Sequence, residues 1–284
     1  MLSLKWDGFG YSSKQFAYWR IAFGLYLLFY FFRVLPYVEE LFSSSNGLPA
    51  ATDNNVLTYY PEFLLNFDSS VQIKIIFYLC IIFSLLILVG WYRRVAALCL
   101  WLLVMWIYNR NPYADSPEYP FVNWLIMILA LIPSGEEFSF SKKKNPKWNM
   151  PLILYWGAWI ILALSYFYAG SVKFKGHDTA WMDGTAMYYV FVTDDGRLPW
   201  YGHFFDNIPK ILFAPLTWGA LLTQTFAFVF ILFRPLRPWW WLISTGIHLG
   251  LALFVNLAQV SFGMALFHFF IFDLNWLPKK KAAF

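Results

Sequence analysis

VQIKIIFYLCIIFSLLILVG, residues 71–90, has Lys74 as its one charged side chain. A helix of about 20 mostly apolar residues is long enough to cross the hydrocarbon core of a bilayer. The whole chain has the same character, since 60% of its 284 residues are hydrophobic, only 13% are charged and its mean hydropathy is +0.52. Its 31 Phe, 18 Tyr and 16 Trp fit a bilayer too, because Trp and Tyr rings favour the headgroup level. The sequence therefore predicts a membrane protein.

Apolar runs of this kind recur along the chain and predict its architecture. The candidate spans lie at 17–36, 71–90, 95–108, 119–133, 151–170, 211–233, 239–257 and 258–276. The third and fourth are short enough to be re-entrant instead of crossing. We keep both as spans because the alternation of basic loops is lost without them. The expected fold class is all-α: a polytopic transmembrane bundle of about eight helices, forming a single domain over residues 1–284.

The basic loops predict the orientation of this bundle. Compact clusters fall on one side of the alternating spans: Arg93 and Arg94; Lys142, Lys143, Lys144 and Lys147; Arg234 and Arg237; Lys279, Lys280 and Lys281. By the positive-inside rule that side is the cytoplasm, and both termini belong to it. The two long loops, 37–70 and 171–210, then face outward, where irregular loops usually carry function. We expect a multi-pass protein of the cell membrane with its active side outside.

Several classes of function lack their motifs. Cys80 and Cys99 lie inside apolar runs, so they form neither a disulfide framework nor a redox or metal motif. No two histidines stand at metal-ligand spacing with a carboxylate, so we predict no metal. There is no GxSxG, no Walker loop and no GxGxxG before a helix. The basic residues form short clusters between spans, which gives nucleic-acid binding no support.

Lys173 is the sharpest candidate for chemistry. It follows Tyr168 near the outer end of the fifth predicted span and precedes Trp181 and Asp183 in the outer loop. A lysine in a partly dry pocket loses its proton more easily, because desolvation disfavours the ammonium, and can act as a base. The alternative is structural: a lysine at a helix C-terminus complements the helix dipole and extends to the headgroups.

The expected roles of the four histidines differ with their predicted depth in the membrane. His248 lies near the middle of the seventh predicted span, where an ionisable group is costly and is a functional candidate. A neutral His248 bonded to a neighbouring helix explains the position equally well. His268, near the inner end of the eighth span, favours a structural role. His177 and His203, in the second outer loop, are expected to be solvated.

Further polar residues lie at the membrane interfaces. Arg20 and Arg33 stand near opposite ends of the first span, and both can extend to the headgroups. Arg33, on the outer side, is alternatively a partner for an outer-loop acid or for an anionic group of a substrate. Glu118 and Tyr119 open the fourth span at the same outer level as Lys173. Asp183 and Asp194 supply further acids.

Two quoted runs carry a family resemblance. YFYAGSVKF (166–174) followed by AWMDGTAMYYVF (180–191) resembles the signature of HTTM-domain proteins, the membrane domain shared with vitamin K-dependent gamma-carboxylase. WRIAFGLYLLFYFFRVLP, VGWYRRVAAL and IHLGLALFVNLAQVSFGMALF resemble the family's first span, second inner turn and late histidine-bearing span. The resemblance covers nearly the whole chain, and its specific part is AG-x-x-K followed by W-x-x-G.

The resemblance implies a role for individual residues. In the carboxylase, the lysine of this region deprotonates reduced vitamin K on the lumenal side, which is topologically outside. That role falls on Lys173 here, with His248 beside it as the second catalytic residue. Tyr168, Trp181, Arg33, Glu118 and Tyr119 are then the expected substrate-binding residues, and a reduced, vitamin K-like quinone is the expected cofactor.

The chain departs from the carboxylase at three places. A polar Asn-His pair that enters the fourth span there is replaced by Glu118 and Tyr119, and Gln224 stands where family members often carry an acid. The chain ends in a basic tail at Lys281, without the extramembrane domain that holds the carboxylase's protein substrate. A full glutamate carboxylase is therefore not expected.

Two functions remain open from the sequence. The first is a carboxylase-like membrane enzyme, a lyase or quinol-dependent oxygenation enzyme with an outward-facing lysine base. The second is a non-catalytic or accessory factor for the maturation of an exported peptide, or for immunity to it, with the peptide or a separate substrate-binding protein as partner. Transport is the weakest option, because the sequence shows neither an inverted repeat nor paired broken helices.

Overall fold

Helices make up the regular structure of the described part of the chain, which comprises residues 11–46, 67–111, 114, 119–140, 144–176 and 179–277 of a computed structural model. They gather into two compact units. The N-terminal unit is Tyr11–Pro151 and the C-terminal unit contains Leu152–Phe284. The prediction of an all-α protein is confirmed, whereas the single domain stays a prediction.

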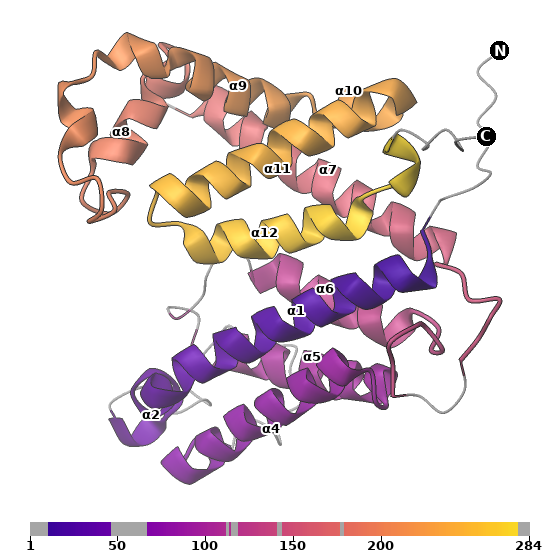
Figure 1. Ribbon diagram of the computed structural model, residues 1–284. Helices are drawn as coiled ribbons and strands as arrows, with labels where there is room; N and C mark the ends of the chain where they lie inside the picture. Colours follow the sequence, from indigo (N-terminus) through magenta and orange to yellow (C-terminus); the bar gives the residue numbers. More distant parts are fainter. Residues whose placement is uncertain are drawn as a thin grey trace, which may run out of the picture. The chain divides into compact units, whose positions relative to one another are not determined.

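The N-terminal unit is built from long helices with regular caps (Figure 1). Its helices are α1 (Ser13–Val34), α2 (Val38–Phe42), α4 (Ser70–Val89), α5 (Arg93–Arg110) and α6 (Tyr119–Leu131). Ser12 accepts a hydrogen bond from the Gln15 N–H at 3.0 Å, and Ser69 forms a capping box with Gln72. Such caps satisfy N–H groups that have no partner within the helix. In sequence order, α4 packs on α1, α5 on α4 and α6 on α5.

The C-terminal unit surrounds one central helix. Its helices are α7 (Leu152–Lys175), α8 (Ala186–Val192), α9 (Ala214–Thr225), α10 (Ala227–Leu232), α11 (Arg237–Phe254) and α12 (Ala258–Ile271). Helix α7 contacts α9, α10 and α12, and α11 lies along α12 (Figure 1). The predicted sixth span is divided into α9 and α10 at Phe226. Just before this break, the Thr223 hydroxyl bonds back to the Gly219 carbonyl at 2.7 Å, a bond of the kind that bends helices.

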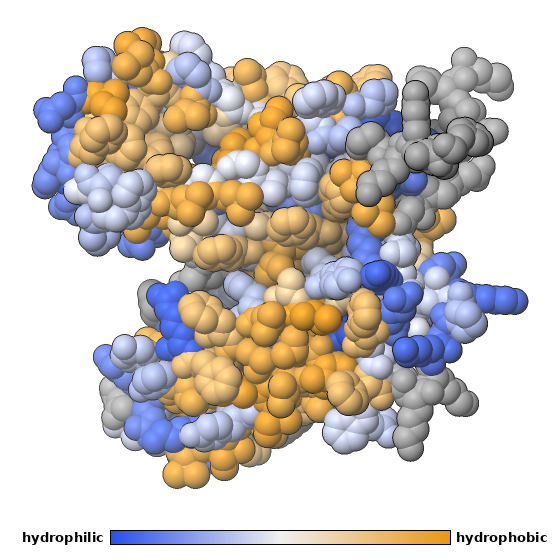
Figure 2. Space-filling view, in the orientation of Figure 1, coloured by the Kyte–Doolittle hydropathy of each residue, from blue (hydrophilic) through white to orange (hydrophobic). Residues whose placement is uncertain are grey.

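Each of the eight predicted spans coincides with helix, but the helices differ in their capacity to cross a membrane. By length and composition three segments are able to cross: Ser13–Phe42, Ser70–Val89 and Leu152–Lys175. Tyr119–Leu131 and Val260–Ile271 are shorter apolar helices. In each unit, apolar side chains cover the helix faces and hydrophilic ones gather toward the helix ends (Figure 2). The chain is a helical membrane protein, and the crossing by all eight helices and the cytoplasmic termini stay predictions.

Arg20 corrects one expectation about the first span. Instead of extending to the headgroups, its side chain is fully buried, with its Nε 3.3 Å from the Glu136 carboxylate. Arg93 donates to the same carboxylate from its Nε at 2.9 Å. The remaining guanidinium nitrogens donate to backbone carbonyls of Ile87, Leu88, Leu129, Ile132, Pro133 and Phe138. These include carbonyls at the ends of α4 and α6 that have no partner within their helix. The buried arrangement is favourable because Glu136 compensates the charge of the guanidinium groups and these groups in turn donate hydrogen bonds to the backbone carbonyls.

Candidate functional site in the C-terminal unit

One face of α7 carries the candidate site. Tyr166, Gly170 and Lys173 are spaced i, i+4 and i+7, so they lie above one another on the same side of the helix. Tyr166 and Gly170 are buried, and Lys173 is partly buried. This face meets α9, α11 and α12 through the contacts described below. The AG-x-x-K part of the sequence motif is therefore a packing face that ends in an amine.

The two motif glycines explain how closely the chain packs on α9. A Cβ at Gly170 would lie 2.6 Å from the backbone nitrogen of Thr225 at the end of α9. A Cβ at Gly184 would lie 2.7 Å from the Cβ of Ala214 at the start of α9, and Gly184 also has a φ of +83°. Neither site has room for a side chain. The glycines thus fix the motif against both ends of α9, and this places Lys173 beside that helix.

Lys173 is held by neutral groups. Its Nζ donates a hydrogen bond to Oε1 of Gln224 at 2.6 Å and lies 4.6 Å from the centre of the Trp181 ring. Within the described part of the chain, no carboxylate forms an ion pair with it. An amine of this kind has three hydrogens when charged, and the amide accepts one of them. Within the described part of the chain, the other hydrogens of the amine have no hydrogen-bond acceptor.

A tyrosine joins two histidines deeper in the same unit. The Tyr166 hydroxyl lies 2.7 Å from Nε2 of His248 on α11 and 2.8 Å from Nε2 of His268 on α12. His268 is fully buried. The two imidazole rings are 5.7 Å apart, centre to centre. Lys173 lies seven residues beyond Tyr166 on the same face of α7, so the amine and the histidine pair lie along one side of this helix.

Two tryptophans of α11 fix this histidine pair. The ring of Trp240 is fully buried and lies 5.1 Å from the Tyr166 ring and 5.5 Å from the His268 ring. Its indole N–H donates to the Thr223 carbonyl at 3.1 Å, while Trp241 donates to the His268 carbonyl at 2.7 Å. Buried indoles with a satisfied N–H are rigid packing elements. The histidines and the tyrosine are therefore held in one arrangement.

The other predicted site residues lie elsewhere. Tyr168 is 72% exposed. It stands two positions after Tyr166 on α7, and residues two positions apart in a helix point to different faces. Arg33 and Tyr119 belong to the N-terminal unit, and Arg33 is exposed. Glu118 lies outside the described residues. Of the predicted set, the structure places Trp181 beside Lys173, and it joins His248 to Tyr166 on the same face of α7.

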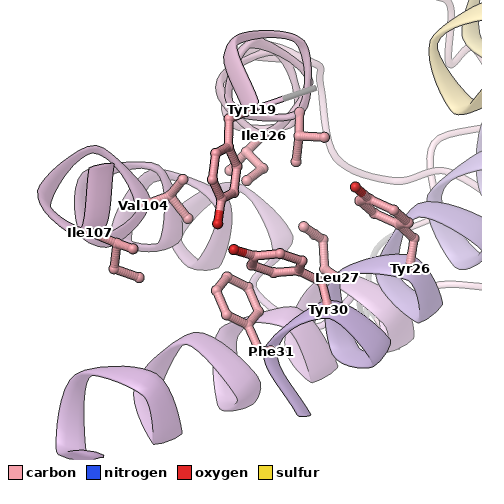
Figure 3. Close-up of a pocket in the computed structure, with 9 residues that line it drawn as sticks. Tyr26, Leu27, Tyr30, Phe31, Val104, Ile107, Tyr119 and Ile126 are labelled. Carbon is pink, nitrogen blue, oxygen red and sulfur yellow. The ribbon is translucent and has the colours of Figure 1, made fainter. Parts of the chain in front are cut away.

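Tyr119 lines a small apolar pocket of the N-terminal unit (Figure 3). Its walls come from α1, α5 and α6: Tyr26, Leu27, Tyr30, Phe31, Val104, Ile107, Tyr119, Val122 and Ile126. The rings of Tyr30 and Tyr119 meet edge to face at 5.5 Å. The cavity measures about 10 Å³, which is about the space that one water molecule needs. In this conformation it is too small for a quinone ring.

The outer-loop groups form local pairs. His203 is exposed, as expected, and its Nδ1 lies 2.6 Å from Asp206, which also pairs with Arg197. The Thr185 hydroxyl and backbone N–H both bond to Asp183, and these bonds lower the pKa of its carboxyl. Asp194 is exposed, and His177 lies outside the described residues. Within the described chain no cluster of three metal-binding side chains is found.

The sequence analysis did not assign Tyr166, Gln224 or His268 to the site. The signal for Tyr166 was present, because it stands seven residues before Lys173 and so shares its helix face. The partners of the other two had no such signal, since Lys173 and Gln224 are 51 residues apart and Tyr166 and His268 are 102 apart. Only the packing of α7 with α9 and α12 brings them together.

Known proteins give limited similarity. The chain is 22% identical over 212 residues to YitO of Bacillus subtilis (strain 168), which covers 71% of the chain and 67% of YitO. It is 28% identical over 171 residues to the sporulation-delaying protein SdpB of the same organism, which covers 57% of the chain and 52% of SdpB. The match thus spans about half the length of SdpB. No solved structure matches, and no family model matches, so the resemblance to HTTM-domain proteins stays a prediction.

Proposed function

We propose that this protein is a membrane enzyme that removes a proton from a lipid-soluble acid, of which a quinol is the expected example, with Lys173 as the base. The observation that carries the proposal is the neutral setting of the Lys173 amine, which is bonded to the Gln224 amide at 2.6 Å and covered by the Trp181 ring at 4.6 Å. A carboxylate partner would favour the charged amine, which cannot accept a proton. An amide partner orients the amine and, because it has no net charge, stabilises the ammonium form less than a carboxylate does.

The surroundings suit an apolar, flat substrate. Trp181 presents an aromatic face beside the amine, and Phe174 and Tyr168 are exposed on α7. Aromatic rings stack with offset faces, so a quinol ring is well matched to Trp181. The quinol hydroxyl would then meet the hydrogen-bonding positions of the amine that Gln224 leaves unused. The resemblance to the carboxylase implies the same substrate class and the same lysine.

The test is an oxygen-dependent epoxidation assay. Purified protein in lipid nanodiscs is supplied with vitamin K hydroquinone or reduced menaquinone and oxygen, and epoxide is measured. We expect epoxide from the wild type and at least about a 10²-fold loss in Lys173→Ala, the usual range for a general base. Lys175→Ala is the matched control, since Lys175 ends the same helix but is exposed. Folded wild type that forms no epoxide, or an active Lys173→Ala, would overturn the proposal.

A second candidate function rests on the similarity to SdpB. That relative is a sporulation-delaying protein, and we propose as an alternative that this chain assists the maturation of an exported peptide or protects its host against one. A deletion strain separates the two. If the phenotype of the deletion is restored by Lys173→Ala as well as by wild type, the role is non-catalytic. Restoration by wild type alone supports the enzyme.

A further inference from the structure

The bridge between the two histidines restricts where their protons are. A tyrosine hydroxyl has one hydrogen, so Tyr166 can donate to only one of the two Nε2 atoms that it contacts, at 2.7 and 2.8 Å. The histidine that receives this hydrogen has a bare Nε2 and carries its own proton on Nδ1. The other histidine donates from Nε2 and has a bare Nδ1. When both rings are neutral, this arrangement uses every atom of the bridge, and it requires opposite tautomers.

The outer ends of the chain of bonds are unsatisfied. Nδ1 of His248 and Nδ1 of His268 are both buried, and neither has a hydrogen-bond partner within the described part of the chain. One of them must therefore be a buried N–H without an acceptor, and the other a buried acceptor without a donor. Unsatisfied buried groups cost free energy, so they point to a role beyond packing. Here they mark the two ends of a path three side chains long.

We propose that His248, Tyr166 and His268 form a proton relay that removes the proton collected at Lys173. The proposal rests on the function proposed above. His248 starts with its proton on Nε2 and accepts at Nδ1 the proton that Lys173 gives up, carried by a water molecule. Its Nε2 proton passes to the Tyr166 oxygen, and the original Tyr166 proton passes to Nε2 of His268. His268 then releases its Nδ1 proton to a second water molecule. One proton enters and one leaves, and both rings end neutral with their tautomers exchanged.

The surrounding structure favours this sequence of transfers. Short oxygen–nitrogen distances allow a proton to move without movement of the rings, and the Trp240 and Trp241 contacts hold Tyr166 and His268 in place. Lys173 lies seven residues beyond Tyr166 on the same face of α7, and His248 is only partly buried whereas His268 is fully buried, so we place the entry of the proton at His248. The relay residues need not touch the substrate, because they act through Lys173.

Nitrogen NMR tests the tautomers without any substrate. The protein is labelled with ¹⁵N-histidine in nanodiscs, and His248→Gln and His268→Gln variants assign the signals. We expect one ring protonated at Nδ1 and the other at Nε2. In Tyr166→Phe this pairing should be lost. Two rings with the same tautomer, or a stably charged ring, would overturn the relay.

Kinetics test the transfers. In the vitamin K hydroquinone assay, Tyr166→Phe should lower kcat by about 10²-fold, with KM unchanged and an altered solvent deuterium isotope effect. Tyr155→Phe is the matched control, since Tyr155 is another buried tyrosine of α7 and its hydroxyl donates to the Ile271 carbonyl, at 2.7 Å, instead of bridging the two histidines. Equal losses in both variants would show a structural role and refute the relay.

The two proposals fail separately. An active Lys173→Ala refutes the proposed enzyme whatever the NMR spectra show. Activity that depends on Lys173 but not on Tyr166, or identical tautomers in an active enzyme, refutes the relay alone.

Discussion

The two units each bury a polar cluster, but the clusters are completed to different degrees. In the N-terminal unit, both Arg20 and Arg93 pair with the Glu136 carboxylate and donate to backbone carbonyls, and Arg20 Nε, without a hydrogen bond of its own, still lies 3.3 Å from that carboxylate. In the C-terminal unit, the bridge through Tyr166 leaves both Nδ1 atoms of His248 and His268 without partners. A cluster whose charges are paired in this way stabilises the fold. An incomplete one has capacity left for protons or ligands.

The clusters differ in charge as well. The arginine cluster has two cations and one carboxylate, all nearly fully buried, so each member depends on the others. The histidine cluster is built from groups that are neutral when they bond as described. Removing one group from the arginine cluster should therefore destabilise the fold. Removing one group from the histidine cluster should lower activity and leave the protein folded. Four substitutions test this difference, and they are ordered from the largest expected effect to the smallest.

Glu136→Ala should have the largest effect. It leaves two buried guanidinium groups without a counter-charge, and breaking a buried ion pair in this way costs about 3 to 5 kcal/mol. We expect a large fall in the melting temperature of the protein in nanodiscs, and little folded protein at expression temperature. The neighbouring Glu137 is exposed, so Glu137→Ala should shift the free energy of unfolding by less than about 0.5 kcal/mol. Equal melting temperatures for the two variants would contradict the structural role of the arginine cluster.

Gly170→Ala should destabilise the C-terminal unit less. Its new methyl group would lie 2.6 Å from the Thr225 backbone nitrogen, and overpacking of this kind costs about 1 to 3 kcal/mol. Because α7 must move away from α9, the bond between Lys173 and Gln224 should weaken and epoxide formation should fall. Gly219→Ala is the control, because a Cβ there meets nothing within 4 Å, and its melting temperature should be equal or higher. A harmless Gly170→Ala would show that the close approach is not needed.

Gln224→Glu tests the neutral setting of Lys173. A carboxylate in place of the amide, now 2.6 Å from the amine, should keep Lys173 charged and lower epoxide formation about tenfold, equivalent to about 1.4 kcal/mol. The measurement is kcat at saturating hydroquinone. Gln224→Met keeps the site neutral and should retain more activity than the glutamate variant. A more active Gln224→Glu would mean that the amine works beside an acid.

Features that depend on neighbouring residues in the sequence could be predicted, whereas contacts between distant residues could not. Helices were predictable from runs of about 20 apolar residues, because the bilayer sets that length locally. Lys173 and Trp181 were found by motif, since both lie within one short stretch. Tyr168 was predicted to bind the substrate, although Tyr166 is the tyrosine that shares the helix face of Lys173. Gln224, Glu136 and His268 find their partners across 40 residues or more, and no local pattern encodes such a pairing.

Arg33→Ala should have the smallest effect and gives the sharpest internal comparison, because Arg20 lies on the same helix. Arg20 is buried and paired, whereas Arg33 is exposed and no ion pair within the described part of the chain includes it. An exposed residue without such contacts contributes within about 0.5 kcal/mol, so Arg33→Ala should leave the melting temperature unchanged. The decisive measurement is KM for the hydroquinone. An unchanged KM assigns Arg33 to the surface, whereas a raised KM with normal stability would restore its predicted role in binding an anionic group of the substrate.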